Sequence, residues 1–146
     1  SLERRGRRLI AVGSGFETKN SRSRESLKLL TYGLTNFDLV EVNNSEKSIG
    51  KVDVWLGKDM EVDVYVNENI YKTIKKAKKK LLKVSIKYEG PIEAPIKKDD
   101  IVGKFRVVYD DEIIGEYDLL AAKDVNKVNI FTRLIRSLNY LIWGDV

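Results

Sequence analysis

The stretch Lys-Val-Asp-Val-Trp-Leu, residues 51–56, places an apolar side chain at every second position, and Met-Glu-Val-Asp-Val-Tyr-Val, residues 60–66, repeats the pattern. Successive side chains of a β-strand point to opposite faces, so a period of two is typical of a strand with one buried face. Gly57-Lys58-Asp59 between them is a turn signal. The stretches therefore predict two half-buried strands whose core-facing set is Val52, Val54, Leu56, Met60, Val62, Val64 and Val66.

The same period recurs over residues 82–88 and 105–109, and residues 113–120 supply a last apolar stretch. Turn signals separate these stretches at Asn43-Asn44, Glu89-Gly90-Pro91 and Asp110-Asp111. Several short strands at such spacing are typical of a compact antiparallel sandwich. We therefore predict a mainly β fold, with an antiparallel β-sandwich over residues 38–128.

Residues 1–37 have a different pattern. Residues 7–15 form a short apolar run behind an arginine cluster and predict a buried strand that ends in a glycine turn. A helix is expected from Ser21 to Phe37, with Ser21 or Ser23 as its N-cap. One strand and one helix bury little surface alone, so we expect an incomplete domain here, its apolar side chains covered by another copy of the chain in a homodimer.

Residues 129–143 predict an amphipathic helix, because seven large apolar side chains fall within an arc of roughly 140° when wound at ~100° per residue. Such a face either docks on its own domain or lies in a membrane interface, where Arg, Tyr and Trp suit the polar boundary. Periodicity does not choose between the two. The candidate membrane-binding residues are Ile130, Phe131, Arg133, Leu134, Ile135, Arg136, Leu138, Leu141, Ile142 and Trp143.

The composition restricts the chemistry. The 146 residues contain neither His nor Cys, which removes the commonest general base, the thiolate nucleophile and the usual zinc ligands. We expect no metal and no cofactor. The net charge of +5 favours an anionic partner. The lysine run at residues 75–80 predicts either a solvated loop or a contact with an anionic surface; nucleic acid is not expected, because no aromatic residues interleave with the lysines.

Three stretches, in this order, resemble the C-terminal part of the low-molecular-mass penicillin-binding proteins, the serine D-alanyl-D-alanine carboxypeptidases. They are Gly-Arg-Arg-Leu-Ile-Ala-Val-Gly at 6–13, Arg-Ser-Arg-Glu-Ser-Leu-Lys-Leu-Leu-Thr-Tyr-Gly-Leu at 22–34 and Glu-Ala-Pro-Ile-Lys-Lys-Asp-Asp-Ile-Val-Gly at 93–103. The resemblance implies the end of a catalytic domain over residues 1–37, a β-sandwich over 38–128 and a membrane-anchoring helix over 129–146. It also implies a parent protein that trims the peptidoglycan pentapeptide through an acyl-serine intermediate.

The family's catalytic motifs are absent in usable form, so we expect no catalytic residue here. Ser48-Ile-Gly-Lys51 matches Ser-x-x-Lys by letters but enters a strand, whereas the motif needs a helix start. One position carries over from the resemblance: Arg22, three residues before Glu25, matches the arginine that helps hold the substrate's terminal carboxylate, with Arg24 as the alternative. A solvated arginine near a helix start is the structural alternative.

The resulting hypothesis is a non-catalytic fragment that serves as a spacer and a membrane anchor at the extracytoplasmic face of the bacterial cytoplasmic membrane. Its partners would be anionic lipid and, through the missing catalytic domain, peptidoglycan. Two rivals remain open: a β-sandwich module that binds a partner protein, and a domain that binds an anionic cell-wall polymer through its lysines.

Overall fold

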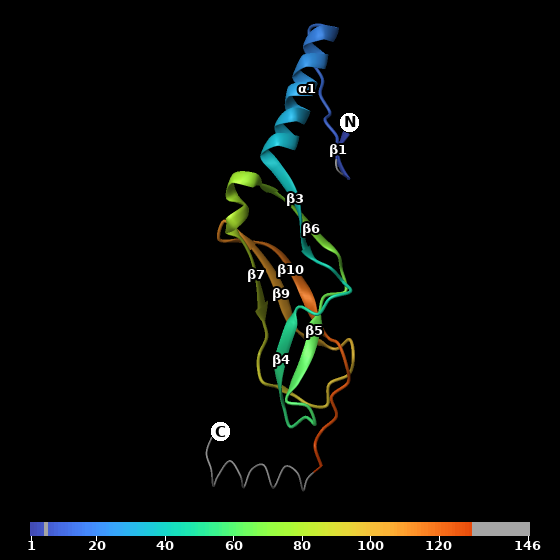
Figure 1. Ribbon diagram of the computed structural model, residues 1–146, viewed down its shortest axis with the longest axis vertical. Helices are drawn as coiled ribbons and strands as arrows, with labels where there is room; N and C mark the ends of the chain where they lie inside the picture. The colour runs from blue at the N-terminus through green and yellow to red at the C-terminus, as the bar shows by residue number, and fades with distance from the viewer. Residues whose placement is uncertain (5, 130–146) are drawn as a thin grey trace.

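The computed structural model describes residues 1–4 and 6–129 and has a mainly β fold, which confirms the predicted class (Figure 1). The predicted terminal helix, apart from Asn129, lies outside these residues. In chain order the elements are β1 (Leu2–Arg4), β2 (Arg7–Leu9), α1 (Lys19–Asn36), β3 (Phe37–Asn43), β4 (Gly50–Trp55), β5 (Glu61–Tyr65), β6 (Ile70–Lys75), the 3₁₀ turn η1 (Lys76–Leu81), β7 (Leu82–Lys87), β8 (Ile92–Glu93), β9 (Ile101–Tyr109) and β10 (Glu112–Ala121).

One sheet has the strand order β7-β9-β10-β5-β4-β8, and a second sheet consists of β3 and β6. All pairs are antiparallel except β4 with β8. The large sheet folds back over itself: Tyr88, after β7, donates a hydrogen bond to Asp53 of β4 at 3.2 Å, and a Cβ added at Gly50 would lie 3.3 Å from Cδ1 of Ile86. Two layers result. We call β7-β9-β10 the back layer, and β3-β6 with β4-β5 the front layer (Figure 1).

The core lies between these layers and consists of the side chains that the period-two pattern turned inward. Phe105, Val107 and Leu119 of the back layer are fully buried, as are Val52, Val62 and Val64 of the front layer. Met60 departs from the pattern and is 71% exposed. Its carbonyl accepts a hydrogen bond from the Val54 amide at 2.7 Å, which places it in the turn before β5 begins.

The turn between β9 and β10 follows directly from its two residues. Asp110 and Asp111 both have positive φ, 54° and 64°. A two-residue hairpin loop requires positive φ at both positions, and Asp tolerates it better than most side chains. The turn signal in the sequence therefore marks the tip of the longest hairpin.

Helix α1 begins two residues earlier than predicted. Thr18, not Ser21 or Ser23, is the N-cap, and its hydroxyl accepts from the Ser21 amide at 3.0 Å. The Ser21 hydroxyl closes the reciprocal contact with the Thr18 amide at 3.1 Å. Ser21, the third residue of the helix, thus completes the capping box, so the N-cap is Thr18, three positions earlier.

The predicted strand over residues 7–15 is also corrected. Only Arg7–Leu9 is a strand, paired in a hairpin with Leu2–Arg4. Beyond it no described strand lies alongside, Val12 is 93% exposed, and Gly15 takes a φ of +77°. An extended segment needs a neighbour to pair its backbone groups, and in residues 1–4 and 6–129 this one has none past Leu9.

The lysine run is not a loop. Lys75 ends β6, and Lys76–Leu81 form the 3₁₀ turn η1, which leads directly into β7. Every lysine of the run remains exposed, as expected for a solvated segment.

Candidate functional site

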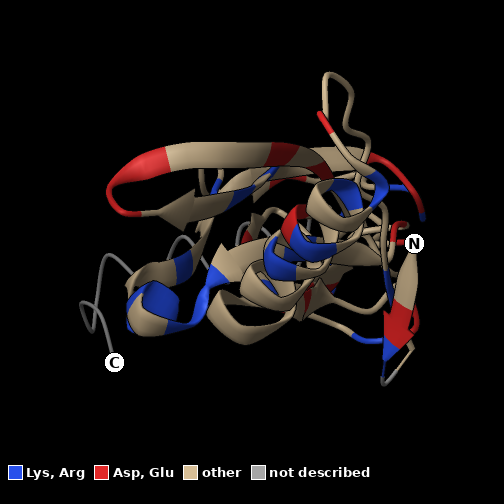
Figure 2. Ribbon diagram, turned by 90° about the horizontal axis from the view of Figure 1, so that it is seen from above, with Lys and Arg blue, Asp and Glu red and all other residues tan. Residues whose placement is uncertain are grey.

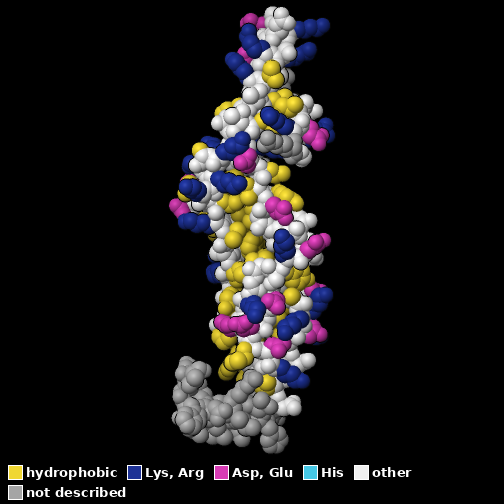
Figure 3. All heavy atoms as spheres, viewed as in Figure 1, with side chains coloured by type: hydrophobic (Ala, Val, Ile, Leu, Met, Phe, Trp, Pro, Cys, Tyr) yellow, Lys and Arg dark blue, Asp and Glu magenta, His cyan; other side chains and the backbone are white. Residues whose placement is uncertain are grey.

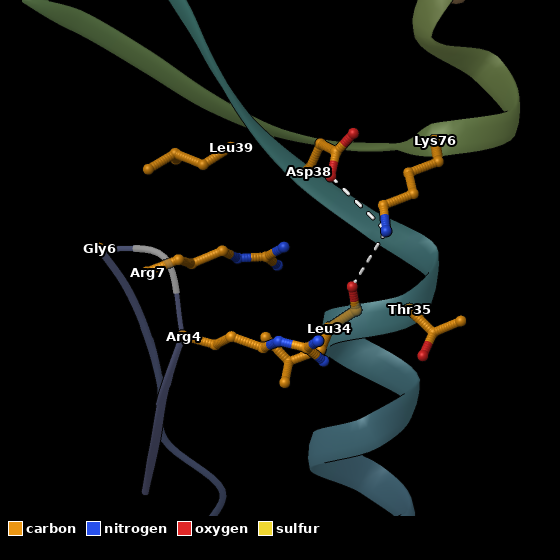
Figure 4. Close-up of a pocket in the computed structure, with 8 residues that line it drawn as sticks. All are labelled: Arg4, Gly6, Arg7, Leu34, Thr35, Asp38, Leu39 and Lys76. Atoms are coloured by element: carbon orange, nitrogen blue, oxygen red, sulfur yellow. Dashed lines mark hydrogen bonds and ion pairs between the residues drawn. The ribbon is translucent and has the colours of Figure 1, made fainter.

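A hollow of about 450 Å³ lies where the N-terminal hairpin, the end of α1, the start of β3 and η1 meet (Figure 4). Arg7 and Lys76 reach it from opposite sides of the junction, and Asp38 stands at the start of β3. Its lining residues are Arg4, Gly6, Arg7, Leu34, Thr35, Asp38, Leu39 and Lys76.

Two cations of this hollow, Arg7 and Lys76, bind the carboxyl end of α1. Arg7 donates from Nη1 to the Phe37 carbonyl and from Nη2 to the Gly33 carbonyl at 3.3 Å. Lys76 donates to the Leu34 carbonyl at 3.2 Å. The last carbonyls of a helix have no partner within it and carry partial negative charge. The last turn of α1 contains no basic residue, so the β1-β2 hairpin and the 3₁₀ turn η1 supply the cations instead.

A carboxylate completes the junction. Asp38 lies 3.7 Å from Nζ of Lys76, and both side chains are about half exposed. Water screens such a pair, so its own contribution to stability is at most about 1 kcal/mol. The arrangement still joins three segments far apart in the sequence: Arg7 from β2, the end of α1 and Lys76 from η1. We therefore regard this hollow as a mechanical joint between residues 1–36 and the β layers.

Three cations and one carboxylate line the hollow. Arg4 points toward α1 in Figure 4 and has no ion-pair partner among residues 1–4 and 6–129. Thr35 supplies the one hydroxyl in the lining. Neither imidazole nor thiol exists anywhere in the chain. The Asp38 carboxylate is therefore the one candidate general base in the lining.

Arg22, the predicted carboxylate-binding residue, is exposed in the first turn of α1 and lines a separate shallow hollow with residues 13–19. Its amide donates to the Thr18 carbonyl at 3.1 Å. The alternative, Arg24, contacts Glu25 at 3.1 Å, and with Lys28 it lowers the pKa of the Glu25 carboxyl. Arg22 has no such carboxylate beside it in the described residues, so its guanidinium is available. Its assigned role remains a prediction.

Ser48 and Lys51 do not form a catalytic pair. The Ser48 hydroxyl donates to backbone carbonyls of Gly50 at 3.2 Å and Val64 at 3.3 Å. Lys51 lies 3.2 Å from Glu61 across the β4-β5 ladder, and this carboxylate raises the pKa of its ammonium group. A lysine that is to act as a base near neutral pH needs the opposite shift.

The membrane-binding set, from Ile130 to Trp143, lies outside the described residues. Within residues 1–4 and 6–129, no helix has the length and apolar character needed to span a bilayer. The exposed lysines of η1 lie on the same side of the molecule as the acidic tip of the β9-β10 hairpin (Figure 2). Lys78 pairs with Asp110 there, which raises the pKa of the lysine.

Sequence reasoning missed the junction, because its acceptors are backbone carbonyls and these carry no sequence signal. The one available clue was negative: the last turn of the helix contains no Lys, Arg or His. A helix end without such residues needs donors from elsewhere.

Comparison with known proteins identifies the family of this chain. Residues 37–127 match the family model described as penicillin-binding protein 5, C-terminal domain. The chain belongs to this family. The penicillin-binding-protein resemblance noted in the sequence is thereby confirmed.

Relatives extend the likeness beyond that domain. D-alanyl-D-alanine carboxypeptidase DacA of Escherichia coli K12 is 30% identical over 129 residues, covering 88% of this chain and 32% of DacA. DacD of Salmonella typhimurium is 29% identical over 131 residues, covering 88% and 33%. The crystal structure of penicillin-binding protein 5 from Haemophilus influenzae matches with a TM-score of 0.63 at 27% identity, covering 75% of this chain and 32% of that chain. The chain thus spans about one third of these relatives.

Proposed function

We propose that this chain forms the C-terminal third of a D-alanyl-D-alanine carboxypeptidase that trims the peptidoglycan pentapeptide through an acyl-serine intermediate. The family match over residues 37–127 is the observation that carries the proposal. In it, residues 1–36 contribute the edge of the catalytic domain, with Arg22 facing the substrate carboxylate. The β layers are the spacer, and residues 129–146 are the membrane anchor.

The arrangement of the described residues supports the spacer role. Helix α1 stands at one end of an elongated molecule, and the described chain leaves at the other end, beyond β4 and β5 (Figure 1). Lys76 of η1 ties the Leu34 carbonyl of α1 to the β layers, and Arg7 of β2 ties the N-terminal hairpin to the Phe37 carbonyl at the start of β3. A spacer must transmit its orientation, and contacts from two segments restrict rotation better than a single connecting peptide bond would.

The anchor is proposed to lie in the plane of the bilayer surface on the extracytoplasmic side. Fifteen residues at ~1.5 Å each cover only about 22 Å, less than a ~30 Å hydrocarbon core. Arg133 and Arg136 would then stay among anionic headgroups, each contributing roughly 1 kcal/mol at low salt.

Sedimentation with anionic liposomes tests the anchor. The intact chain should pellet, whereas a truncation after Val128 and the double variant Leu134→Asp/Leu138→Asp should stay in the supernatant. The matched control is Ile10→Asp/Ile113→Asp, which makes the same two charge changes at exposed apolar positions elsewhere and should still pellet. If the truncated chain pelleted as well as the intact one, residues 129–146 would not be the anchor, and the lysines of η1 would be the next candidate.

A fluorescent penicillin tests the division of labour. The 146-residue chain should not become labelled, because Ser48 is held by backbone carbonyls and Lys51 by Glu61. Labelling that disappears in Ser48→Ala would contradict the proposal that catalysis belongs to the part of the protein outside this chain.

A further inference from the structure

Val84, in the middle of β7, is unusually exposed for its position. It pairs with Val107 of β9, and side chains that pair directly across two strands share one face of the sheet. Val107 is 0% exposed and Val84 is 52% exposed. Val84 therefore points to the inner face of the back layer, yet nothing in the described chain covers it.

The cause is a mismatch in width between the layers. Lys72 of β6 donates to the Ile114 carbonyl of β10 at 3.1 Å and lies 5.5 Å from the Tyr117 ring, so β6 lies over β10. At this level the front layer has two strands, β6 and β3, whereas the back layer has three, β10, β9 and β7. The front layer is one strand short, and the strand left uncovered is β7.

An open hollow of about 430 Å³ occupies the place of the missing strand. Phe105 forms part of its floor, Val84 one side, and Val42 of β3 the other, with the loop after β3 closing one end. Figure 3 shows hydrophobic side chains along the middle of this face, next to a cluster of lysines. The free edge of β3 borders the hollow, because within residues 1–4 and 6–129 β3 pairs only with β6.

The charges around the hollow differ between its ends. η1 joins β6 to β7 near the start of β3, beyond the residues that line the hollow, and its Lys79 and Lys80 are exposed and without an ion pair among the described residues. Lys83 of β7 and Lys47 of the loop after β3 are also exposed and have no ion pair among the described residues. Glu41 is the one carboxylate among the lining residues.

We propose that this hollow binds an extended segment of a partner protein, which pairs with the free edge of β3 as an added strand. The segment would place apolar side chains at alternate positions against Val84, Val42 and Phe105, and acidic side chains at the end nearer η1. Addition to β3 covers Val84 and completes the front layer, whereas addition to the free edge of β7 would widen the back layer and leave Val84 exposed. Strand addition of this kind supplies affinity through the backbone and specificity through alternate side chains.

The proposal is independent of the membrane anchor, and its test uses the full chain. Random peptides long enough to match β3 would be displayed and selected against the immobilised chain. Enriched peptides should share apolar residues at every second position and acidic residues at one end. Selection that yields no such pattern would overturn the proposal.

Variants then place the binding site. Val84→Asp should weaken binding of a selected peptide at least tenfold, because it puts a carboxylate on an apolar side of the hollow. The matched control Ile113→Asp changes net charge equally at a residue of similar exposure, 56%, and should bind as the parent does. Lys80→Gln should weaken binding a few-fold at low salt and less at high salt, whereas Lys58→Gln, at the β4-β5 turn, should not. Equal binding by Val84→Asp and the parent would refute the site.

Hydrogen exchange distinguishes the edge that is used. Bound peptide should slow amide exchange in β3 and leave β8 unchanged. Slower exchange in β7 without any change in β3 would show that the wrong edge was chosen. Light scattering of the free chain tests whether a second copy of the chain fills the hollow instead. A dimer that Val84→Asp converts to a monomer would show this and would overturn the proposed partner.

Discussion

Asn43 offers the sharpest test of how the front layer is held. It is the last residue of β3 and the one buried polar residue among residues 1–4 and 6–129, at 7% exposure. Its side-chain amide donates to the carbonyls of Val66 at 3.2 Å and Glu68 at 2.7 Å. Both carbonyls precede β6, so one side chain fixes the end of β3 to the segment that leads into its partner strand.

The cost of Asn43→Ala follows from these contacts. Each lost hydrogen bond removes about 1 kcal/mol, and a buried carbonyl left without a donor costs about 1–3 kcal/mol more. We therefore expect the free energy of unfolding to fall by about 3–5 kcal/mol, a large share of the ~5–15 kcal/mol typical of a domain. The β3 register should loosen as well, because a shift already lies between Glu41 and Asn43.

Urea denaturation followed by far-ultraviolet circular dichroism measures this loss. Asn67→Ala is the matched control, since Asn67 lies in the same β5-β6 connection but is exposed. The control should change the free energy of unfolding by no more than about 0.5 kcal/mol. If Asn43→Ala behaved like the control, the two hydrogen bonds would not be holding β3, and the reasoning would fail.

Asn43→Asp adds a pH dependence of known sign. A carboxylate facing two carbonyl oxygens in a buried place is disfavoured, so its pKa in the folded protein should exceed its unfolded value of about 3.9. A group with a raised folded pKa stabilises the fold below its unfolded pKa and loses that effect as pH rises through the folded pKa. The variant should therefore approach Asn43→Ala in stability at about pH 4 and fall below it at about pH 7. A pH-independent difference between the two variants would contradict this.

Three further predictions concern other parts of the molecule. Phe105→Ala should lower the free energy of unfolding by about 3–5 kcal/mol in urea titrations, whereas Ile101→Ala, at an exposed position of the same strand, should have little effect. Hydrogen exchange should be fastest in residues 1–36, because α1 has no buried residue; protection there equal to that of β9 would contradict the idea of an incomplete domain. The hydrogen bond to Asp99 raises the pKa of Tyr65, so the tyrosine contributes stability that persists below its unfolded pKa of about 10 and disappears above the folded pKa. In an ultraviolet titration, Tyr65→Phe should lose a component that ionises above the ordinary pKa of tyrosine.

Period-two patterning predicted β4, β5, β7 and β9, and a last apolar stretch predicted β10, because each carries its own inward-facing apolar side chains. It missed β3 and β6, for two physical reasons. Phe37 continues the apolar face of α1 by spacing, although the helix ends at Asn36 and Phe37 starts the strand. Lys75 completes β6 although it opens the lysine run. Strands that pair mainly with one another across 30 residues of chain are selected by their partner, and a local pattern does not contain that partner.

The functional sites were harder to predict than the strands for a related reason. The joint at the end of α1 consists of Arg7 and Lys76 bound to backbone carbonyls, separated by 69 positions in the printed sequence. The hollow beside Val84 results from a count of strands in two layers, which exists only after folding. Arg22, by contrast, came from the family resemblance alone, and no contact of the described residues tests its role.

β3 links the joint at α1, the buried Asn43 and the hollow beside Val84. It follows α1 without a linker, and the carbonyl of its first residue, Phe37, accepts the hydrogen bond from Arg7. Its last residue, Asn43, is fixed to the connection before β6, and its free edge borders the hollow. Force applied to α1 therefore reaches the β layers along β3 and, through Lys76, along η1. A segment paired with β3 would add backbone hydrogen bonds along that same strand, so occupancy of the hollow should stiffen the connection between α1 and the β layers and slow hydrogen exchange at the Phe37 amide.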